Sequence, residues 1–445
     1  MSLRIRLLAA ALLVAGLAPL ARAQGPLRLT LQEAITRAQT RGPNALAARA
    51  TRDAARARDN AFDGALLPQI AITGNLPTFN RSIIPVLQPD GSTLFRSQEQ
   101  NEGTVGMSIT QRLPFTGGDL FINSGLSRLD VVGTTSTRTW SSTPMLVGIR
   151  QDIFRPNQQR WNNREQALRI EVAERQYREA LEDVAIATAN AFFDYYTAKL
   201  GMENAAFNAS VNDTLYRLNR GRFEVGRIGE NDLLQSELAL LRAQVALDGA
   251  RLEHDRTLAA LRIALDLPVG APLEIVVPTE IPELAADTAV AVQMALRHRA
   301  QMRELELQEV QADRRITEAR FGSGFGGTIT ASMGVNQTAS ALDAVYRDLR
   351  EAQRFQLGVS MPLVQWGVRS NQIRAARLDG DRVEYLGKQT REQTSQEAHF
   401  AALGLAQARR GLAIAAKADT VGTKRFEVAK NRYVVGRINI DNLYM

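Results

Sequence analysis

The chain has 445 residues, of which 45% are hydrophobic and 23% are charged, and it contains no cysteine. The lack of cysteine excludes disulfides, thiolate metal ligands and cysteine nucleophiles, and the three histidines lie far apart in the sequence. The net charge is +7, but the 54 Lys and Arg are interleaved with 47 Asp and Glu instead of forming one basic face. These features argue against a metal enzyme and against a nucleic-acid-binding protein.

Residues 1–23 predict a signal peptide. Two arginines precede an apolar run over residues 7–18, which is too short for a transmembrane helix, and a small-x-small cleavage site ends at Ala23. Beyond residue 23 no run of 18 apolar residues occurs. We therefore expect an exported protein that is periplasmic, secreted or a β-barrel of an outer membrane.

The remaining chain is predicted to contain two tandem structural repeats, residues 24–280 and 281–445. The segment RFEVGRIGENDL at 222–233 recurs as RYVVGRINIDNL at 432–443, an offset of 432 − 222 = 210 residues. A weaker match relates Ala34 and Ala38 to Ala291 and Ala295 at an offset of 257. Self-similarity of this kind indicates a duplicated unit, and each unit reads as helix, strand, strand, long helix, turn and long helix.

The predicted strands of the first repeat lie at about 66–76 and 146–154. In the second repeat, Ile329, Ala331, Met333 and Val335 alternate with small or polar residues, and residues 356–363 alternate in the same way. This pattern is typical of the wall of a transmembrane β-barrel, although a soluble antiparallel sheet that covers a core also alternates. Two strands per repeat do not close a barrel, so several chains would have to contribute.

The two offsets differ by 47 residues, and we assign this excess to a loop and a β-hairpin at about 77–145. Residues 77–103 contain several prolines and are predicted to form a surface loop. Residues 104–126 are predicted to form a β-hairpin around a glycine turn. The sequence leaves open whether this hairpin adds two strands to the wall or projects from it.

Residues 157–267 are predicted to form a long coiled-coil hairpin. No proline occurs between Asn157 and Leu267, and Leu238, Val245 and Leu252 recur every seven residues. A helix from about 160 to 218 would be roughly 90 Å long. Such a helix is a spacer and not part of a globular core.

These features together resemble the TolC-like outer membrane efflux protein family (outer membrane factors). The resemblance rests on the signal peptide, the duplicated units and the (Phe/Tyr)-x-Val-Gly-Arg-Ile segment that begins at Phe223 and at Tyr433. It implies a mainly α protein with a membrane β-barrel part. Three identical chains would share one barrel of 12 strands, four from each chain, and the long helices would form a periplasmic tunnel.

The chain departs from the expected pattern near Met445. The first repeat continues through a helix to about Leu267, so its counterpart would continue to about residue 477, which is 267 + 210. We therefore expect the second repeat to be truncated in its last helix and the sequence beyond Met445 to be missing.

The two Val-Gly-Arg segments are the candidate functional site. We expect each glycine to end a helix and reverse the chain, while the Asn-Asp or Asp-Asn pair caps the following helix. A capped turn alone would explain much of this pattern, but the resemblance implies a periplasmic tip that contacts an adaptor and forms an aperture. The residues assigned to it are Gly226, Arg227, Ile228, Asn231, Asp232, Gly436, Arg437, Ile438, Asp441 and Asn442.

The sequence shows no catalytic constellation, cofactor motif or metal site. The preferred function is an outer-membrane channel of a tripartite efflux or type I secretion system that acts as a passive export duct. Its expected partners are two further copies of itself, a periplasmic adaptor, an inner-membrane transporter and outer-membrane lipid, with no nucleic acid. The alternative is a periplasmic coiled-coil adaptor protein without a pore, and the sequence identifies neither the cargo nor the pump class.

Overall fold

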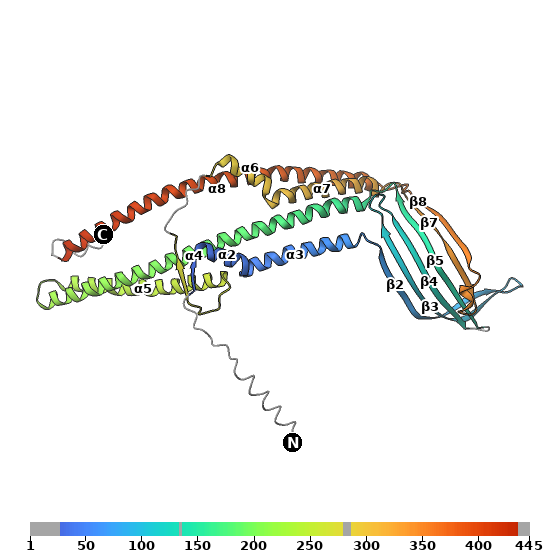
Figure 1. The fold of residues 1–445 in the computed structure, drawn as a ribbon, viewed down its shortest axis with the longest axis horizontal. Coiled ribbons are helices and arrows are strands. Elements are labelled where there is room, and N and C mark those ends of the chain that lie inside the picture. The colour runs from blue at the N-terminus through green and yellow to red at the C-terminus, as the bar shows by residue number, and fades with distance from the viewer. Residues whose placement is uncertain (1–26, 133–135, 279–285, 435–445) are drawn as a thin grey trace, which may run out of the picture. The chain divides into compact units, whose positions relative to one another are not determined.

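The computed structural model describes residues 27–132, 136–278 and 286–434 (Figure 1). The signal peptide predicted at residues 1–23 lies outside the described residues. The chain divides into two compact units, one made of Met1–Thr51 and Tyr177–Leu284 and the other of Arg52–Gln176 and Ala285–Met445. The division into two sequence repeats stays a prediction.

The helices and strands follow one another along the chain as coloured from blue to red in Figure 1. They are β1 (Leu27–Thr30), α2 (Leu31–Arg41), α3 (Pro43–Gly64), β2 (Gln69–Leu87), β3 (Thr93–Arg112), β4 (Asp119–Val132), β5 (Thr137–Ile153), α4 (Gln158–Glu224), α5 (Glu230–Ala264), β6 (Leu273–Val276), α6 (Thr288–His298), α7 (Ala300–Gly322), β7 (Gly326–Ala339), the 3-10 turn η1 (Ala344–Tyr346), β8 (Arg350–Ser360) and α8 (Val368–Val434).

The bounds of several helices differ by the offsets found in the sequence. The helices α4 and α8 each have 67 residues, and both ends of α8 lie 210 residues after those of α4. The helices α2 and α6 each have 11 residues and differ by 257 at both ends. At about 1.5 Å per residue, α4 is roughly 100 Å long.

The main sheet has six strands in the order β2-β3-β4-β5-β7-β8, and every neighbouring pair is antiparallel. The predicted hairpin at residues 104–126 is confirmed, because β3 and β4 pair in register from Glu99 opposite Val132 to Arg112 opposite Asp119. The hairpin lies between β2 and β5, so it adds two strands to the sheet.

The surface loop predicted for residues 77–103 is wrong. The strand β2 continues to Leu87 and β3 begins at Thr93, so both strands are longer than expected. Proline removes a backbone donor, but an edge strand or a bulge tolerates it. Pro85 lies in β2, which is an edge strand, and Pro77 lies within the register shift between Asn75 and Thr78.

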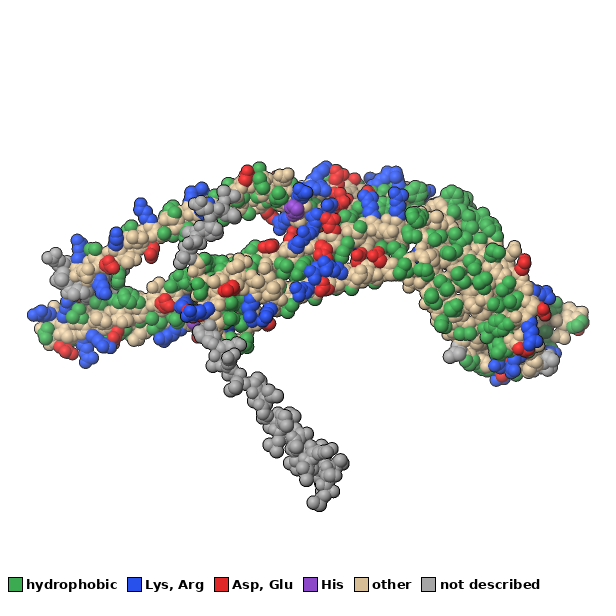
Figure 2. Space-filling view, viewed as in Figure 1, with side chains coloured by type: hydrophobic (Ala, Val, Ile, Leu, Met, Phe, Trp, Pro, Cys, Tyr) green, Lys and Arg blue, Asp and Glu red, His purple; other side chains and the backbone are tan. Residues whose placement is uncertain are grey.

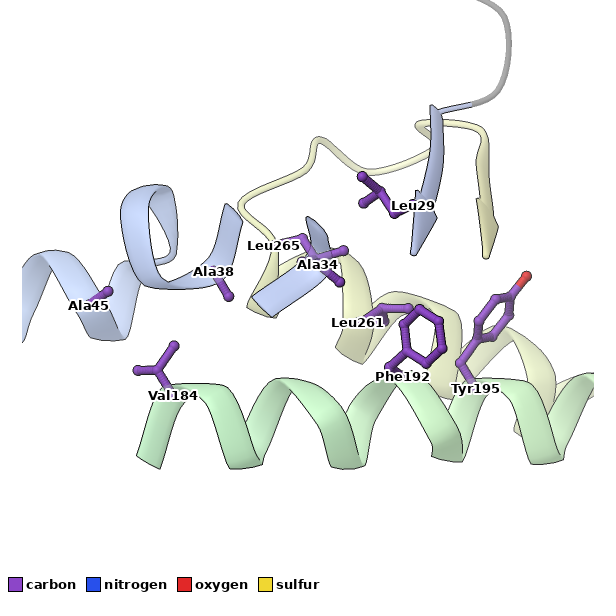
Figure 3. Packing of buried hydrophobic residues seen from close by; sticks show 9 residues of the cluster. All are labelled: Leu29, Ala34, Ala38, Ala45, Val184, Phe192, Tyr195, Leu261 and Leu265. Carbon is purple, nitrogen blue, oxygen red and sulfur yellow. The ribbon is translucent and has the colours of Figure 1, made fainter. Parts of the chain in front are cut away.

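The first unit has a small hydrophobic core, shown in Figure 3. Phe192 of α4 and Leu261 and Leu265 at the end of α5 are fully buried beside Ala34 and Ala38 of α2. The capping box of Thr30 and Glu33 starts α2, and the small residues on one face of α2 permit close packing. The core includes further residues, namely Leu29, Ala45, Val184 and Tyr195.

A two-stranded parallel pair, β1 with β6, flanks this core and was not predicted from the sequence. Leu27 lies opposite Leu273, and Thr30 lies opposite Val276. Each strand has four residues, which is too short for alternation to be recognised in the sequence. An ion pair between Arg28 and Glu274, 2.7 Å apart, lies on the same pair of strands.

In the second unit, ion pairs join α6 and α7 to α8. Arg299, next to α7, lies 2.8 Å from Glu397, and Arg391 of α8 lies 2.7 Å from Glu309. Arg350 and the other residues of β8 then precede α8 directly in the chain. The helix α7 thus leads into β7, and α8 follows β8.

Arg314 links α7 to the start of α4. Its guanidinium donates to Glu165 at 2.9 Å, to Asn162 at 2.9 Å and to Gln158 at 2.8 Å. Its Nε donates to Glu318 at 2.8 Å. The Glu165 side chain is only 5% exposed, and the hydrogen bond to it raises the pKa of Arg314. Arg169 donates to the other Glu165 oxygen at 2.8 Å, so both oxygens of this buried carboxylate are paired.

Among the described residues, no helix is both long enough and apolar enough to cross a membrane.

Candidate functional site

The six-stranded sheet has one apolar face. Cross-strand partners point to the same side of a sheet, so the register assigns each residue to a face. Ile70, Ile109, Ile122, Val147 and Met333 follow one another across five strands. The full apolar face consists of Ile70, Ile72, Val105, Met107, Ile109, Leu120, Ile122, Leu126, Met145, Val147, Ile149, Ile329, Ala331, Met333, Val335, Phe355, Leu357 and Val359.

The opposite face is lined by small and polar side chains. Its residues include Gln69, Thr73, Thr104, Ser108, Thr110, Asn123, Gly148, Arg150, Thr330, Ser332, Arg354 and Gln356. Phe121 is an exception, and its ring lies over Gly148, where a Cβ would come within 2.4 Å of the ring. We call this side the polar face.

The apolar face is uncovered. The exposed fraction reaches 77% at Ile72 and 73% at Phe355. In the part of the chain that the structure describes, only the short 3-10 turn η1 packs on the sheet, against β5 and β7, and no α-helix crosses either face. Large exposed apolar patches are characteristic of surfaces that contact lipid or another protein. The alternative of a soluble sheet that covers a core is therefore disfavoured by the structure.

Charged side chains follow the apolar face at the end of the sheet away from the helices (Figure 2). Asp130 accepts from Arg128 at 2.5 Å and from Arg138 at 2.9 Å. The Arg128 guanidinium also lies 5.4 Å from the centre of the Trp140 ring. This charged rim depends on the pairing of β4 with β5, and for that reason the sequence alone did not reveal it.

Both edges of the sheet are open. The strands β2 and β8 each have one paired side, and no other described strand pairs with the second side. An open edge exposes a row of backbone N–H and C=O groups that can pair with another chain. Neither edge is shielded by a helix of the described residues.

The candidate tip at the end of α4 is a glycine-centred turn. Gly226 has a φ of +68°, in the left-handed region that favours glycine. The Gly226 N–H donates to the Phe223 carbonyl at 2.9 Å, and the Arg227 N–H donates to the Arg222 carbonyl at 2.8 Å. This pair of bonds is a Schellman motif, so the predicted helix end at Gly226 is confirmed.

The predicted capping role of Asn231 and Asp232 is wrong. The N-cap of α5 is Gly229, with no side-chain cap, and the helix begins at Glu230. Asn231 and Asp232 therefore lie in the first turn of α5. There the Asp232 carboxylate is placed favourably against the positive end of the helix dipole.

Arg227 and Asn231 are exposed, and Ile228 and Asp232 are half-buried. Within the described residues, no ion pair joins Arg227 to Asp232. The second predicted tip, with Gly436, Arg437, Ile438, Asp441 and Asn442, lies outside the described residues. Its contribution to a site stays a prediction.

A stripe of apolar residues on α5 is also exposed. Its members, spaced by four, three, four and seven residues, are Leu234, Leu238, Leu241, Val245 and Leu252, with exposed fractions of 54%, 47%, 52%, 73% and 72%. This spacing is that of a coiled-coil seam, in which such residues pack against another helix. The stripe has no such partner within the described residues of its unit.

Among the described residues, no three histidine, aspartate or glutamate side chains are grouped so that they could hold a metal ion.

Solved structures share this fold. The Campylobacter jejuni CmeC outer membrane channel is 16% identical, with a TM-score of 0.68 over 93% of this chain and 78% of that chain. The Vibrio cholerae outer membrane protein VceC is 14% identical, with a TM-score of 0.64 over 93% of this chain and 88% of that chain. The open state of the Neisseria gonorrhoeae MtrE outer membrane channel is also 14% identical, with a TM-score of 0.60 over 93% and 81%.

No family model matches the chain, and no curated protein sequence matches it. Sequence identities this low establish the fold and nothing finer. The predicted resemblance is confirmed at that level, and the chain has the fold of the TolC-like outer membrane factor channels.

Proposed function

We propose that the chain is one subunit of an outer-membrane channel of a Gram-negative-type bacterium. Three copies would close a barrel in the membrane, and their long helices would form a tunnel in the periplasm. The observation that carries this proposal is the uncovered apolar face of a sheet whose other face is polar. A barrel wall needs this combination, because one face contacts lipid and the other contacts water.

The apolar face ends at a charged rim, as the apolar band of a membrane wall does. On β4 it extends from Leu120 to Leu126, about 20 Å along the strand at roughly 3.3 Å per residue. The charged rim at Arg128 and Asp130 follows directly on the same strand. An outer-membrane wall has an apolar band about 25 Å tall that ends at the lipid headgroups, where charged and aromatic side chains are favourable.

The open edges require further copies of the chain. In the hydrocarbon core of a membrane, each unpaired backbone N–H or C=O costs several kcal/mol, so a sheet persists there only when it is closed. The number three comes from the resemblance to the outer membrane factors. The exposed stripe on α5, from Leu234 to Leu252, supplies an apolar surface that a helix of a neighbouring copy or of an adaptor can cover.

The turn at Gly226 is proposed as part of the periplasmic end of the tunnel. Arg227 and Asp232 of one copy, with Arg437 and Asp441 of the second tip, would pair across the entrance and keep it narrow. Exposed ion pairs contribute only about 0–1 kcal/mol each, so an adaptor that binds the tips could separate them. The channel itself would be a passive duct without a cofactor, driven by an inner-membrane transporter.

The location and pore are tested by membrane fractionation and conductance. We expect the protein in the outer-membrane fraction, where unheated samples migrate at the size of a trimer and boiled samples at that of a monomer. Purified protein should produce discrete conductance steps in planar lipid bilayers. Recovery in the soluble periplasmic fraction without conductance would instead support the alternative, a coiled-coil adaptor without a pore.

The tip is tested by removing its acidic residues. The double variant Asp232→Ala and Asp441→Ala should raise the single-channel conductance, because the arginines at the entrance lose their acceptors. Glu203→Ala, at an exposed position in the middle of α4, is the control. Equal conductance of the double variant and the control would rule out ion pairs as the closing element.

A further inference from the structure

We propose that all six strands of each copy enter the membrane wall, so that three copies form a barrel of 18 strands. This inference rests on the proposed function. The resemblance to the outer membrane factors implies four strands per copy, and the difference is the hairpin β3–β4. A barrel of 18 strands is wider, so the duct would admit bulkier solutes than one of 12 strands.

The hairpin carries the same two faces as the rest of the sheet. Met107 and Ile109 of β3 and Ile122 of β4 lie on the apolar face, level with Ile72 and Ile70 of β2. The intervening Ser108 and Asn123 lie on the polar face. A hairpin that projected into water would have no reason to present apolar side chains on one side at the same depth as its neighbours.

The backbone pairing places β3 and β4 inside the wall. The ladder between them is continuous from Glu99 to Arg112, without a register shift. On either side, β3 pairs with β2 and β4 pairs with β5 over most of their lengths. Removing the hairpin from the membrane would expose the facing backbone groups of β2 and β5 to lipid, which is strongly unfavourable.

The strand directions permit closure by identical copies. Because all neighbours are antiparallel and there are six strands, β2 and β8 run in opposite directions. The β8 edge of one copy can therefore pair with the β2 edge of the next copy in the same antiparallel manner. Three copies of the six-stranded sheet then give 18 strands with no edge left open.

The strand number sets the width of the barrel. At equal tilt, barrel diameter grows roughly linearly with the number of strands, so 18 strands give a barrel roughly 1.5-fold wider than 12. The polar face that would line it consists mostly of small and polar residues, such as Thr73, Ser108 and Ser332. Such a lining leaves the added width open to water and to solutes.

The position of β4 is tested with spin labels on introduced cysteines, because the chain contains no cysteine. Ile122→Cys and Asn123→Cys probe the two faces of β4, while Val147→Cys and Ser332→Cys are references for the apolar and polar faces of strands outside the hairpin. The label at 122 should be as accessible to oxygen, which concentrates in lipid, as the label at 147. The label at 123 should be accessible to chelated nickel in water, like the label at 332.

The outcomes separate this inference from the proposed function. If the label at 147 contacts lipid and the label at 122 contacts only water, β4 lies outside the membrane and the 18-stranded barrel is wrong, while a membrane channel remains. If the label at 147 is also in water, both proposals fail.

The width is tested by excising the hairpin. Asn80, Gln100, Val131 and Thr137 lie side by side across β2 to β5, so deletion of residues 84–135 removes β3 and β4 and joins β2 to β5 through a four-residue turn. In bilayers, polymers added on the sheet side should enter the unmodified channel up to a radius roughly 1.5-fold larger than in the excised one. Equal limiting radii would contradict the proposal.

The closing edges are tested by disulfides between copies. Thr73→Cys on β2 combined with Arg354→Cys or Gln356→Cys on β8 should give covalent trimers after oxidation, without higher species. A ladder of larger species, or no cross-link with any combination while the label at 122 contacts lipid, would show that the copies do not close edge to edge in threes.

Discussion

The first unit and the sheet use similar apolar residues in opposite ways. In the first unit, Phe192, Leu261 and Leu265 are 0% exposed, and they pack against small residues of α2. On the sheet, Ile72 is 77% exposed and Phe355 is 73% exposed, with no described helix over them. Hydrophobic side chains thus stabilise the first unit internally, whereas those of the sheet gain their stabilisation only from surroundings outside the chain.

This contrast explains why the sheet, and not the core, indicates the function. Burial of apolar surface contributes about 25 cal/mol per Å² wherever the surface leaves water. The core obtains this energy during folding of one chain. In the proposed channel, the sheet obtains it on transfer into lipid, so its stability and its location are coupled. Substitutions in the core should consequently change the free energy of unfolding, whereas substitutions on the apolar face should change the yield of protein inserted in the membrane.

The largest effect is expected from Phe192→Ala. Loss of this fully buried ring leaves a cavity in the first unit and should lower the free energy of unfolding by about 4 kcal/mol. Phe207→Ala, on the same helix with 56% of the residue exposed, is the matched control and should lower it by less than about 1 kcal/mol. Denaturation followed by circular dichroism measures both free energies of unfolding. Similar values for the two variants would show that Phe192 is not buried in a packed core.

Arg314→Ala should follow, because the buried Glu165 carboxylate then loses its cross-helix partner. Arg169 still pairs with Glu165, so we expect a loss of about 2 kcal/mol in the free energy of unfolding. Arg217→Ala removes an exposed pair with Asp213 on α4 and should cost less than about 1 kcal/mol. If the two substitutions are equivalent, Glu165 is hydrated and the link between α7 and α4 is weak.

On the sheet, Phe355→Arg should oppose membrane insertion, and Gln356→Arg should not. The two residues are neighbours on β8 but lie on the apolar and polar faces. Arginine near the middle of a lipid-facing wall costs about 2 kcal/mol or more. The yield of heat-modifiable oligomer from outer membranes should therefore fall for Phe355→Arg alone. The reverse order of yields would mean that the faces are assigned incorrectly.

The parts of this fold that depend on local patterns were predictable from the sequence. The alternation from Ile329 to Val335 predicted β7, the segment 104–126 predicted a hairpin, and Gly226 predicted a helix end. In each case neighbouring residues determine the conformation, through side-chain period or through backbone freedom.

The remaining parts depend on partners distant in the sequence. Pro77 and Pro85 suggested a loop, but a bulge and an edge position allow strand β2 to continue through them. Arg138 and Trp140 join Arg128 and Asp130 in the charged rim only once β4 pairs with β5. At the candidate tip, Asn231 has the side chain of a good cap, yet the chain places Gly229 at that position because the preceding turn ends there.

The smallest expected effect is a pH dependence of stability, which the charged helices should show and the uncharged apolar face should not. Burial raises the pKa of Glu171, but hydrogen bonds and charges from Arg175 and Arg303 outweigh it, so the pKa of this carboxyl lies below its usual value. A lowered folded-state pKa contributes stability above the unfolded pKa, near 4.5, and this contribution is lost as the pH falls through the folded value.

Glu171→Gln should therefore lower the denaturation midpoint slightly at pH 7, by an amount that disappears as the pH falls below the folded-state pKa of Glu171. The expected loss is below about 1 kcal/mol, because the Glu171 side chain is 38% exposed and solvent weakens its ion pairs. Glu203→Gln, at an exposed site on the same helix, should leave the midpoint unchanged at every pH. If the difference in midpoint between Glu171→Gln and the unmodified protein grew as the pH fell, the coupling would have the opposite sign, and the ion pairs of Glu171 with Arg175 and Arg303 would not stabilise the fold.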